Sequence, residues 1–224
     1  MMIKNIMSMG RYMLLTLVLS MVYVPLFSQG DASFNLSELV GVNLKNPTSL
    51  DYGPDNRLYV SQQNGLIYAY TIARLGPDNY QVTATETILD IKNTLNHDDD
   101  GTPNPSVTDR QITGVLVTGT SGNPVLWVAH SDPRIGGGGK GGDINLDTNS
   151  GMITKLVWNG SDWIKTDVVV GLPRSEENHA NNGLQYDEAN NLLYITSGGS
   201  TNAGSPSNNF AFLTEYALSC AIPV

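Results

Sequence analysis

The chain has 224 residues, with 12 Lys and Arg against 21 Asp and Glu. A net charge of −9 without a basic cluster argues against binding to nucleic acid, whose phosphates attract Lys and Arg. The single cysteine, Cys220, excludes an intrachain disulfide, so the fold must be held together by packing or by a metal.

The N-terminus has the pattern of a secretory signal peptide. Lys4 and Arg11 precede a nearly unbroken apolar run over residues 13–24, and residues 25–29 resemble a cleavage region. The apolar run is shorter than the roughly 20 residues that a membrane-spanning helix needs. We therefore expect residues 1–29 to be removed and the protein to be secreted or periplasmic, with no membrane span after cleavage. An uncleaved anchor is the alternative.

Short β-rich runs separated by Gly, Asn, Asp, Ser and Thr predict an all-β domain over residues 30–224. A hairpin pattern recurs in this domain, and its aromatic residues Tyr59, Trp127 and Tyr194 are 68 and 67 residues apart. Further strand-like runs follow each hairpin, and residues 210–222 are expected to continue the third unit. About four strands per repeat is typical of propeller blades.

The predicted blades cover roughly residues 40–108, 109–170 and 171–224. A propeller needs at least four blades to close, so three blades indicate an incomplete propeller and a truncated chain. The alternative is a β-sandwich in which similar hairpins occur by chance.

His179 stands five residues before Leu184, on the loop that enters the third hairpin. Propeller ligands bind at the axial mouth, where such loops meet, and an imidazole there can act as a general base near neutral pH. Alternatively, His179 is an ordinary surface histidine in a polar loop.

One acidic loop suggests calcium. Asp143, Asn145 and Asp147 alternate along it, as oxygen ligands do in a calcium loop. The loop lacks the sixth-position glycine and the final glutamate of an EF-hand, so a solvated turn is the alternative. The glycine run at 136–142 lacks the features of a phosphate loop and is expected to be a loop between strands.

Two segments resemble the soluble quinoprotein glucose/sorbosone dehydrogenase family. Residues 47–60, which read PTSLDYGPDNRLYV, resemble the family's opening blade, and His179 followed by GLQYD and LYITSGG resembles its segment with a catalytic histidine. Residues 110–116, RQITGVL, loosely resemble a second-blade motif with a polar active-site side chain. The resemblance covers about residues 40–220.

The resemblance implies a six-bladed propeller that binds pyrroloquinoline quinone (PQQ), with calcium holding the cofactor, and that oxidises a sugar hydroxyl by hydride transfer to the quinone. His179 would be the base that takes the hydroxyl proton. Gln111 would be a catalytic and cofactor-binding partner, and Asn178 and His179 would also contact the cofactor. Family members often carry Asp where this chain has Asn178, which removes a negative charge.

Three functions follow from these patterns. The first is a PQQ-dependent sugar dehydrogenase-like protein, of which this chain is an incomplete and inactive portion. The second is a non-catalytic propeller that binds extracellular glycans or proteins, which the substitution at Asn178 favours. The third is a calcium-dependent hydrolase of the lactonase type, which needs buried axial oxygen ligands that the sequence does not reveal.

Overall fold

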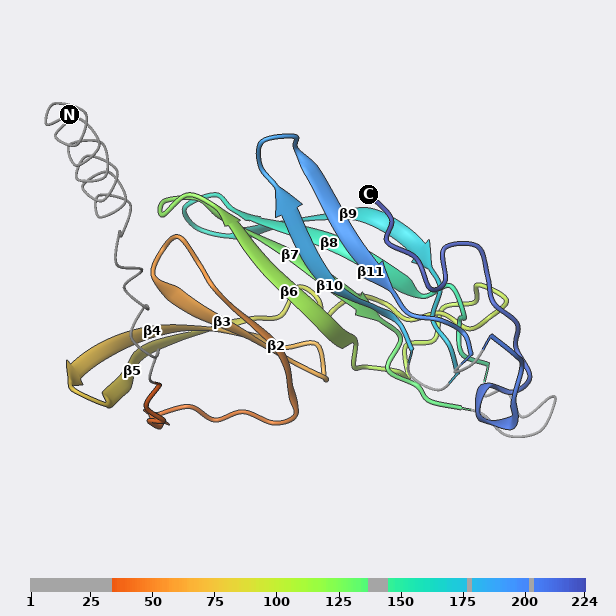
Figure 1. Ribbon diagram of the computed structural model, residues 1–224, viewed down its shortest axis with the longest axis horizontal. Helices are drawn as coiled ribbons and strands as arrows, with labels where there is room; N and C mark the ends of the chain where they lie inside the picture. The colour runs from red at the N-terminus through yellow and green to blue at the C-terminus, as the bar shows by residue number, and fades with distance from the viewer. Residues whose placement is uncertain (1–33, 137–144, 177–178, 202–203) are drawn as a thin grey trace, which may run out of the picture. The chain divides into compact units, whose positions relative to one another are not determined.

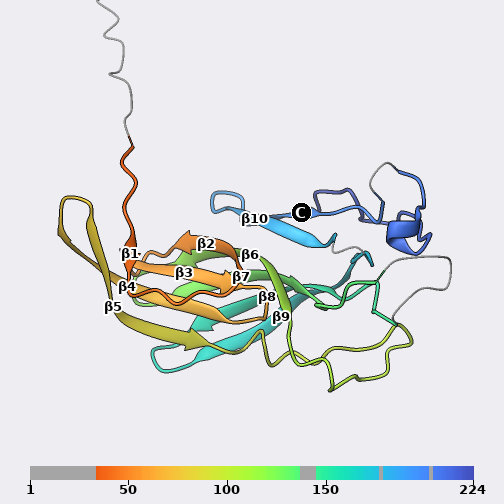
Figure 2. The ribbon, with the colours of Figure 1, turned by 90° about the horizontal axis from the view of Figure 1, so that it is seen from below.

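Three β-sheets follow one another along the chain in the computed structural model, which describes residues 34–136, 145–176, 179–201 and 204–224 (Figures 1 and 2). Residues 37–224 form one unit. The strands are β1 (Leu39–Val40), β2 (Pro47–Tyr52), β3 (Arg57–Gln62), β4 (Ile67–Gly76), β5 (Asn79–Ile88), β6 (Gln111–Gly119), β7 (Pro124–Ser131), β8 (Gly151–Trp158), β9 (Trp163–Leu172), β10 (Asn181–Asp187) and β11 (Leu192–Ser197). The predicted all-β, partial propeller fold is confirmed.

The first two sheets are each built from four consecutive antiparallel strands, β2 to β5 and β6 to β9. Strand β1 adds to the first sheet by pairing with β5 in parallel. The third sheet contains β10 and β11, and a bridge from Ser197 to Ala221 extends it by one position. Within the described residues only η1 (Asn208–Phe210) is helical, and no helix there is long and apolar enough to cross a membrane.

Strands β2, β6 and β10, with which the consecutive antiparallel strands of each sheet begin, lie side by side and run in the same direction (Figure 1). The N–H of Val115 donates to Ser49 Oγ at 3.1 Å, an offset of 66 residues between β2 and β6. The Thr113 hydroxyl donates to the Asn181 carbonyl, an offset of 68 residues between β6 and β10. These contacts align the three sheets as adjacent blades, with β2, β6 and β10 as their inner strands.

Each inner strand also has a register shift near its start. The shifts fall between Pro47 and Ser49 in β2, between Ile112 and Gly114 in β6, and between Asn181 and Leu184 in β10. A bulge at one equivalent place in each blade bends the strand where it enters the sheet. The repeat seen in the sequence is therefore a repeat of backbone geometry.

The repeating aromatic residues Tyr59, Trp127 and Tyr194 all lie on the second strand of their sheets, opposite the inner strand. Tyr59 is fully buried and meets Trp163 of the next blade edge-on, with ring centroids 6.3 Å apart. Trp127 stacks on Tyr186 of the third blade at 6.0 Å. Two of the three aromatics therefore join their own blade to the following one, which explains why the spacing recurs.

Apolar side chains fill the two contacts between blades. The cluster between the first and second blades includes Tyr59, Ile67, Ile88, Ile112, Leu126 and Leu156. The cluster between the second and third blades contains Ala129, Ile153, Leu172 and Ile195, with Leu184 and Leu193 packed against it. Burial of these faces supplies the main stabilisation of an arrangement without disulfides.

The expectation that residues 210–222 continue as strands is wrong for most of that segment. Ala211, Phe212, Leu218 and Cys220 have positive φ angles between 48° and 69°, which an extended strand cannot contain. Turns therefore replace the strand until Ala221, where the bridge to Ser197 forms.

Gly114 provides a test of the packing between inner strands. A Cβ at this position would lie 2.1 Å from the Asn182 carbonyl oxygen, whereas a Cβ at Gly122 would meet nothing within 4 Å. We expect Gly114→Ala to lower the free energy of unfolding by about 1–3 kcal/mol, because backbone must move to admit the methyl group. Urea denaturation measures the change, with Gly122→Ala as the matched control. Equal stabilities of the two variants would contradict this packing.

Candidate functional site

The starts of the three inner strands form the candidate site. Counted by the offsets of 66 and 68 residues between neighbouring inner strands, Lys45, Gln111 and His179 are counterparts in the repeat, one from each blade. All three lie where the chain enters an inner strand, so this end of the strands is called the mouth below. The two residues that the sequence predicts as catalytic, Gln111 and His179, thus occupy equivalent positions on neighbouring blades.

His179 is partly exposed and is fixed from both its backbone and its ring. Its N–H donates to Ser175 Oγ at 2.9 Å, and its ring lies 5.2 Å from the buried ring of Phe210. Its Nδ1 lies 3.2 Å from the Gly199 carbonyl oxygen. Since a carbonyl only accepts, Nδ1 carries the hydrogen in this bond, and in the neutral ring Nε2 keeps its lone pair.

A cavity of about 460 Å³ lies beside His179. Ser197, Gly198, Gly199 and Thr201 contribute to its lining. The Ser197 hydroxyl oxygen is buried and has no hydrogen-bond partner among the described residues. The neutral imidazole can therefore accept a proton from a hydroxyl group that enters this cavity.

Gln111 is turned into the protein rather than toward solvent. It is 5 % exposed, and its Oε1 accepts a hydrogen bond from Arg174 Nη2 at 3.3 Å. Arg174 is fully buried and also donates to the carbonyl oxygens of Asp132, Ser175 and Arg134. Burial lowers the pKa of Arg174 to about 10, which leaves the guanidinium charged at neutral pH. Gln111 is thus part of the support beneath the mouth.

A second buried arginine, Arg110, begins a chain of hydrogen bonds through the second blade. Its Nε donates to His130 Nδ1 at 2.9 Å, so His130 Nε2 carries the hydrogen and donates to Thr154 Oγ1 at 2.7 Å. The Thr154 hydroxyl donates in turn to Asp167 Oδ1 at 2.6 Å. Burial, and then the positive charge of Arg110, lower the pKa of His130 well below its ordinary value. His130 is therefore a neutral structural residue inside β7.

A run of three aspartates at 98–100 is tied to the loop after β7. Arg134 forms ion pairs of 2.7 Å with Asp98 and with the buried Asp132. The hydrogen bonds to Asn104 and Arg134 lower the pKa of Asp98. These contacts neutralise both carboxylates and join the loop 98–100 to the loop after β7.

The predicted calcium loop is only partly within the described residues. Asp143 lies outside them, as does Asn178 of the predicted cofactor site. Asp147 accepts a hydrogen bond from the Asn149 N–H at 2.9 Å, and burial raises its pKa. Asn145 is exposed and interacts with Asp98. No group of three or more His, Cys, Asp and Glu side chains placed to bind a metal occurs in the described part of the chain.

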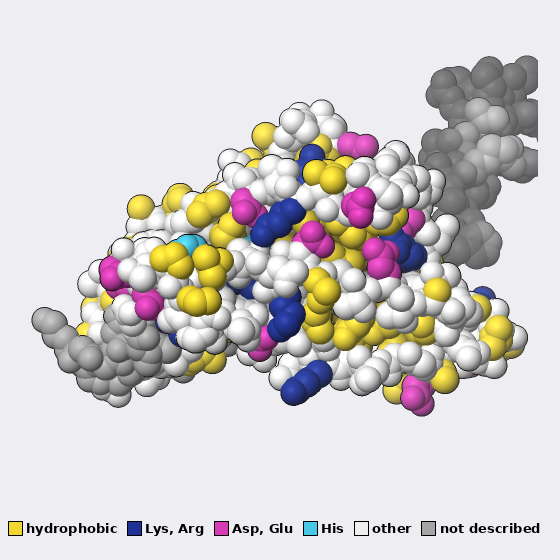
Figure 3. All heavy atoms as spheres, turned by 180° about the vertical axis from the view of Figure 1, so that it is seen from behind, with side chains coloured by type: hydrophobic (Ala, Val, Ile, Leu, Met, Phe, Trp, Pro, Cys, Tyr) yellow, Lys and Arg dark blue, Asp and Glu magenta, His cyan; other side chains and the backbone are white. Residues whose placement is uncertain are grey.

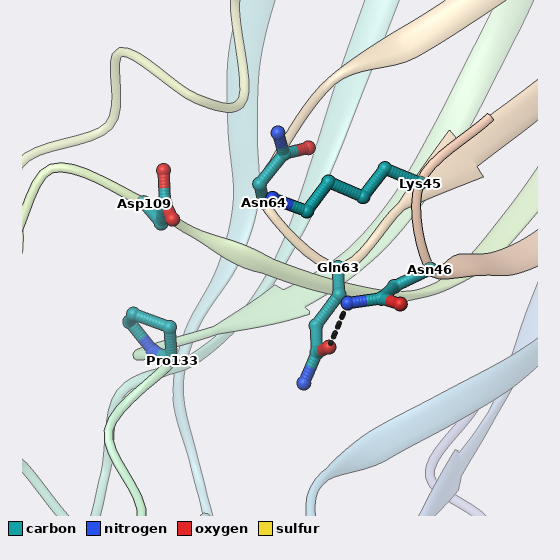
Figure 4. A pocket seen from close by; sticks show the side chains of 6 residues that line it. All are labelled: Lys45, Asn46, Gln63, Asn64, Asp109 and Pro133. Atoms are coloured by element: carbon teal, nitrogen blue, oxygen red, sulfur yellow. Dashed lines mark hydrogen bonds between the residues drawn. The ribbon is translucent and has the colours of Figure 1, made fainter. Parts of the chain in front are cut away.

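A second cavity, of about 310 Å³, lies at the mouth between the first and second blades (Figure 4). Lys45, Asn46, Gln63, Asn64, Asp109 and Pro133 line it. The backbone fixes this lining, because Lys45 N–H donates to Gln62 Oε1 and Gln63 N–H donates to the Asn46 carbonyl at 3.0 Å. The sequence patterns did not point to this cavity. The polar pair Gln63-Asn64 in the turn before β4 is the one feature of the sequence that could have indicated the cavity. Such a pair is equally typical of an ordinary turn, so it does not identify a site.

The surface carries charges of both signs. On the face shown in Figure 3, basic and acidic side chains are interspersed and lie beside apolar ones. No continuous basic patch appears among the coloured residues of that face.

No family model matches the chain, and no curated protein matches it. The chain is similar to a solved structure from Trichoderma reesei, described as the iodide structure of Carbohydrate-Active Enzymes Family AA12. The two share 13 % sequence identity with a TM-score of 0.44, and the match covers 74 % of this chain and 33 % of the other. The chain thus spans about a third of the length of that structure.

His130 makes stability depend on pH in a defined direction. The folded state keeps His130 neutral, whereas the unfolded chain takes up a proton below about pH 6.5. Its contribution to stability is therefore fully present above that pH and is lost as the pH falls, by at most about 1.4 kcal/mol per pH unit. Urea denaturation between about pH 5 and 7.5 measures the slope.

The control for this prediction is His130→Gln, which retains an acceptor for Arg110 and a donor for Thr154 but does not titrate. We expect its stability to depend less on pH than that of the wild type. Equal slopes for the wild type and His130→Gln would contradict the assignment.

Proposed function

We propose that the chain belongs to a secreted, sugar-oxidising propeller protein in which His179 accepts the proton of a sugar hydroxyl. The observation that carries the proposal is the hydrogen bond from His179 Nδ1 to the Gly199 carbonyl. This bond leaves Nε2 as the proton acceptor, and the ring borders a cavity at the mouth. The resemblance of residues 179–199 to a dehydrogenase segment supports the same role.

The resemblance names PQQ as the hydride acceptor, and the described residues do not by themselves fit that group. PQQ carries several carboxylates and requires several cationic partners. At the mouth, the guanidinium groups of Arg110, Arg134 and Arg174 already donate to protein oxygens or nitrogen, which leaves Lys45. Further contacts to the quinone, and the predicted calcium site, would have to involve residues outside those described. The chemical role of the described residues is therefore limited to proton acceptance by His179.

A second candidate function is a non-catalytic propeller that binds extracellular glycans or proteins. The observation that favours it is the burial of Gln111 against Arg174. In this alternative Gln111 supports the mouth through its hydrogen bond to Arg174 and has no catalytic role. In this alternative the cavities at the mouth bind a sugar without changing it.

His179→Ala tests the proposed reaction. We expect dye-coupled sugar oxidation by the full-length protein to fall by about 10²–10⁴-fold in the variant, because the general base is lost. His97→Ala is the matched control, since His97 is likewise a partly exposed loop histidine but does not line the cavity beside His179. Calorimetry with PQQ and calcium gives the cofactor arm of the test. A well-folded full-length protein that neither binds PQQ nor oxidises sugars would overturn the dehydrogenase proposal and leave the binding function.

A further inference from the structure

Lys45 differs from the other basic side chains. Of the lysines and arginines in the described ranges, Lys45 is the one whose side chain has no ion pair, hydrogen bond or ring contact. The others pair with carboxylates (Arg57, Lys92, Arg134, Lys165), form buried hydrogen bonds (Arg110, Arg174) or lie over aromatic rings (Arg74, Lys155). Lys45 is exposed, so its ammonium group is available to a ligand.

The cavity around Lys45 is otherwise lined by neutral polar groups. Asn46, Gln63 and Asn64 contribute side-chain amides, which both donate and accept hydrogen bonds. Asn46 Nδ2 and Gln63 Oε1 are 3.5 Å apart, a long contact that a ligand hydroxyl can replace. Figure 4 shows these side chains around the cavity, with the Lys45 side chain extended.

Asp109, the acidic residue of the cavity, is already neutralised. Lys92 Nζ forms an ion pair with Asp109 Oδ1 and lies 3.5 Å from the Asn64 carbonyl oxygen. The ammonium of Lys45 therefore gives the cavity its net charge, which is positive in a chain whose net charge is −9. A cavity of about 310 Å³ is at the small end of the range for small-molecule sites.

We propose that this cavity binds a sugar acid, with its carboxylate on Lys45 and its hydroxyl groups on the amides of Asn46, Gln63 and Asn64. The choice of a sugar ligand rests on the proposed function; the requirement for a carboxylate rests on Lys45. Lys45 supplies one unpaired positive charge, so a ligand with a single carboxylate matches the net charge of the cavity. A polyhydroxylated monoanion such as glucuronate matches one cation and several amides.

PQQ also carries carboxylates that could bind Lys45, so the experiment compares a sugar acid with PQQ. Calorimetry at low salt measures the binding of glucuronate, glucose and PQQ to the full-length protein. We expect glucuronate to bind at least about tenfold more tightly than glucose, and its affinity to fall as salt screens the charge. Equal affinities for glucuronate and glucose, including no binding of either, would overturn the proposal.

The variants Lys45→Met and Lys155→Met form a matched pair. Lys45→Met removes the charge at the cavity, so we expect glucuronate to bind no more tightly than glucose. Lys155→Met removes a lysine that lies over Trp127, 5.0 Å from the ring centre, and should retain the preference for glucuronate. Because the Lys45 side chain is exposed and unpaired in the described structure, thermal denaturation should show that Lys45→Met is folded.

Two outcomes separate this proposal from the proposed function. Glucuronate binding that depends on Lys45, without any oxidation, would support the cavity and contradict the dehydrogenase. Oxidation of neutral sugars without a preference for glucuronate in binding would support the dehydrogenase and contradict the sugar-acid cavity. If PQQ binding depends on Lys45 and glucuronate does not bind, the cavity is a cofactor contact and the sugar-acid assignment is wrong.

Discussion

The hydrogen bonds between inner strands determine the rest of the structure. The free edge of β6 would expose unpaired N–H groups inside the fold, and Ser49 and Asp51 of β2 accept those of Val115 and Val117 at 3.1 and 2.7 Å. Side chains thus replace a backbone ladder between blades. Because each acceptor fits one N–H, the contact sets the offset between neighbouring strands, and this offset aligns Lys45 with the equivalent positions at the mouth.

Two buried arginines hold the loops at the mouth in place. They would destabilise the fold if their N–H donors had no acceptors. Arg110 donates to His130, Asn96 Oδ1 and the Ser150 carbonyl, and Arg174 donates to carbonyl oxygens of three loop residues. Most of these acceptors lie on loops rather than in strands. The guanidinium groups therefore fix polar loop segments that have few apolar side chains of their own.

The blade repeat could be predicted from the sequence because it depends on patterns of residues that are close together in the chain. Alternating apolar residues, polar turns and the aromatics Tyr59, Trp127 and Tyr194 depend on neighbours within one hairpin or on the next blade. The site could be predicted only in part. His179 was identified because it precedes a recognisable hairpin. The burial of Gln111 could not be predicted, because it results from Arg174, which is 63 residues away in the sequence.

The turn-rich segment after β11 shows the same limit. Its composition does not exclude strands, yet successive positive φ angles at Ala211 and Phe212 place Phe210 against His179 instead. That contact, together with the Gly199 carbonyl, selects the orientation of the imidazole. A local departure from the repeat thus produces the geometry on which the proposed chemistry depends.

The mouth is chemically asymmetric, and this asymmetry has a consequence for ligand orientation. Lys45 on the first blade presents a cation, Gln111 on the second is turned inward, and His179 on the third presents a proton acceptor. A ligand anchored by its carboxylate at Lys45 has a fixed end, and the amides that would receive its hydroxyl groups belong to the same blade, in a cavity that shares no lining residue with the one beside His179. The cation of the first blade and the proton acceptor of the third therefore serve two different cavities of the same mouth.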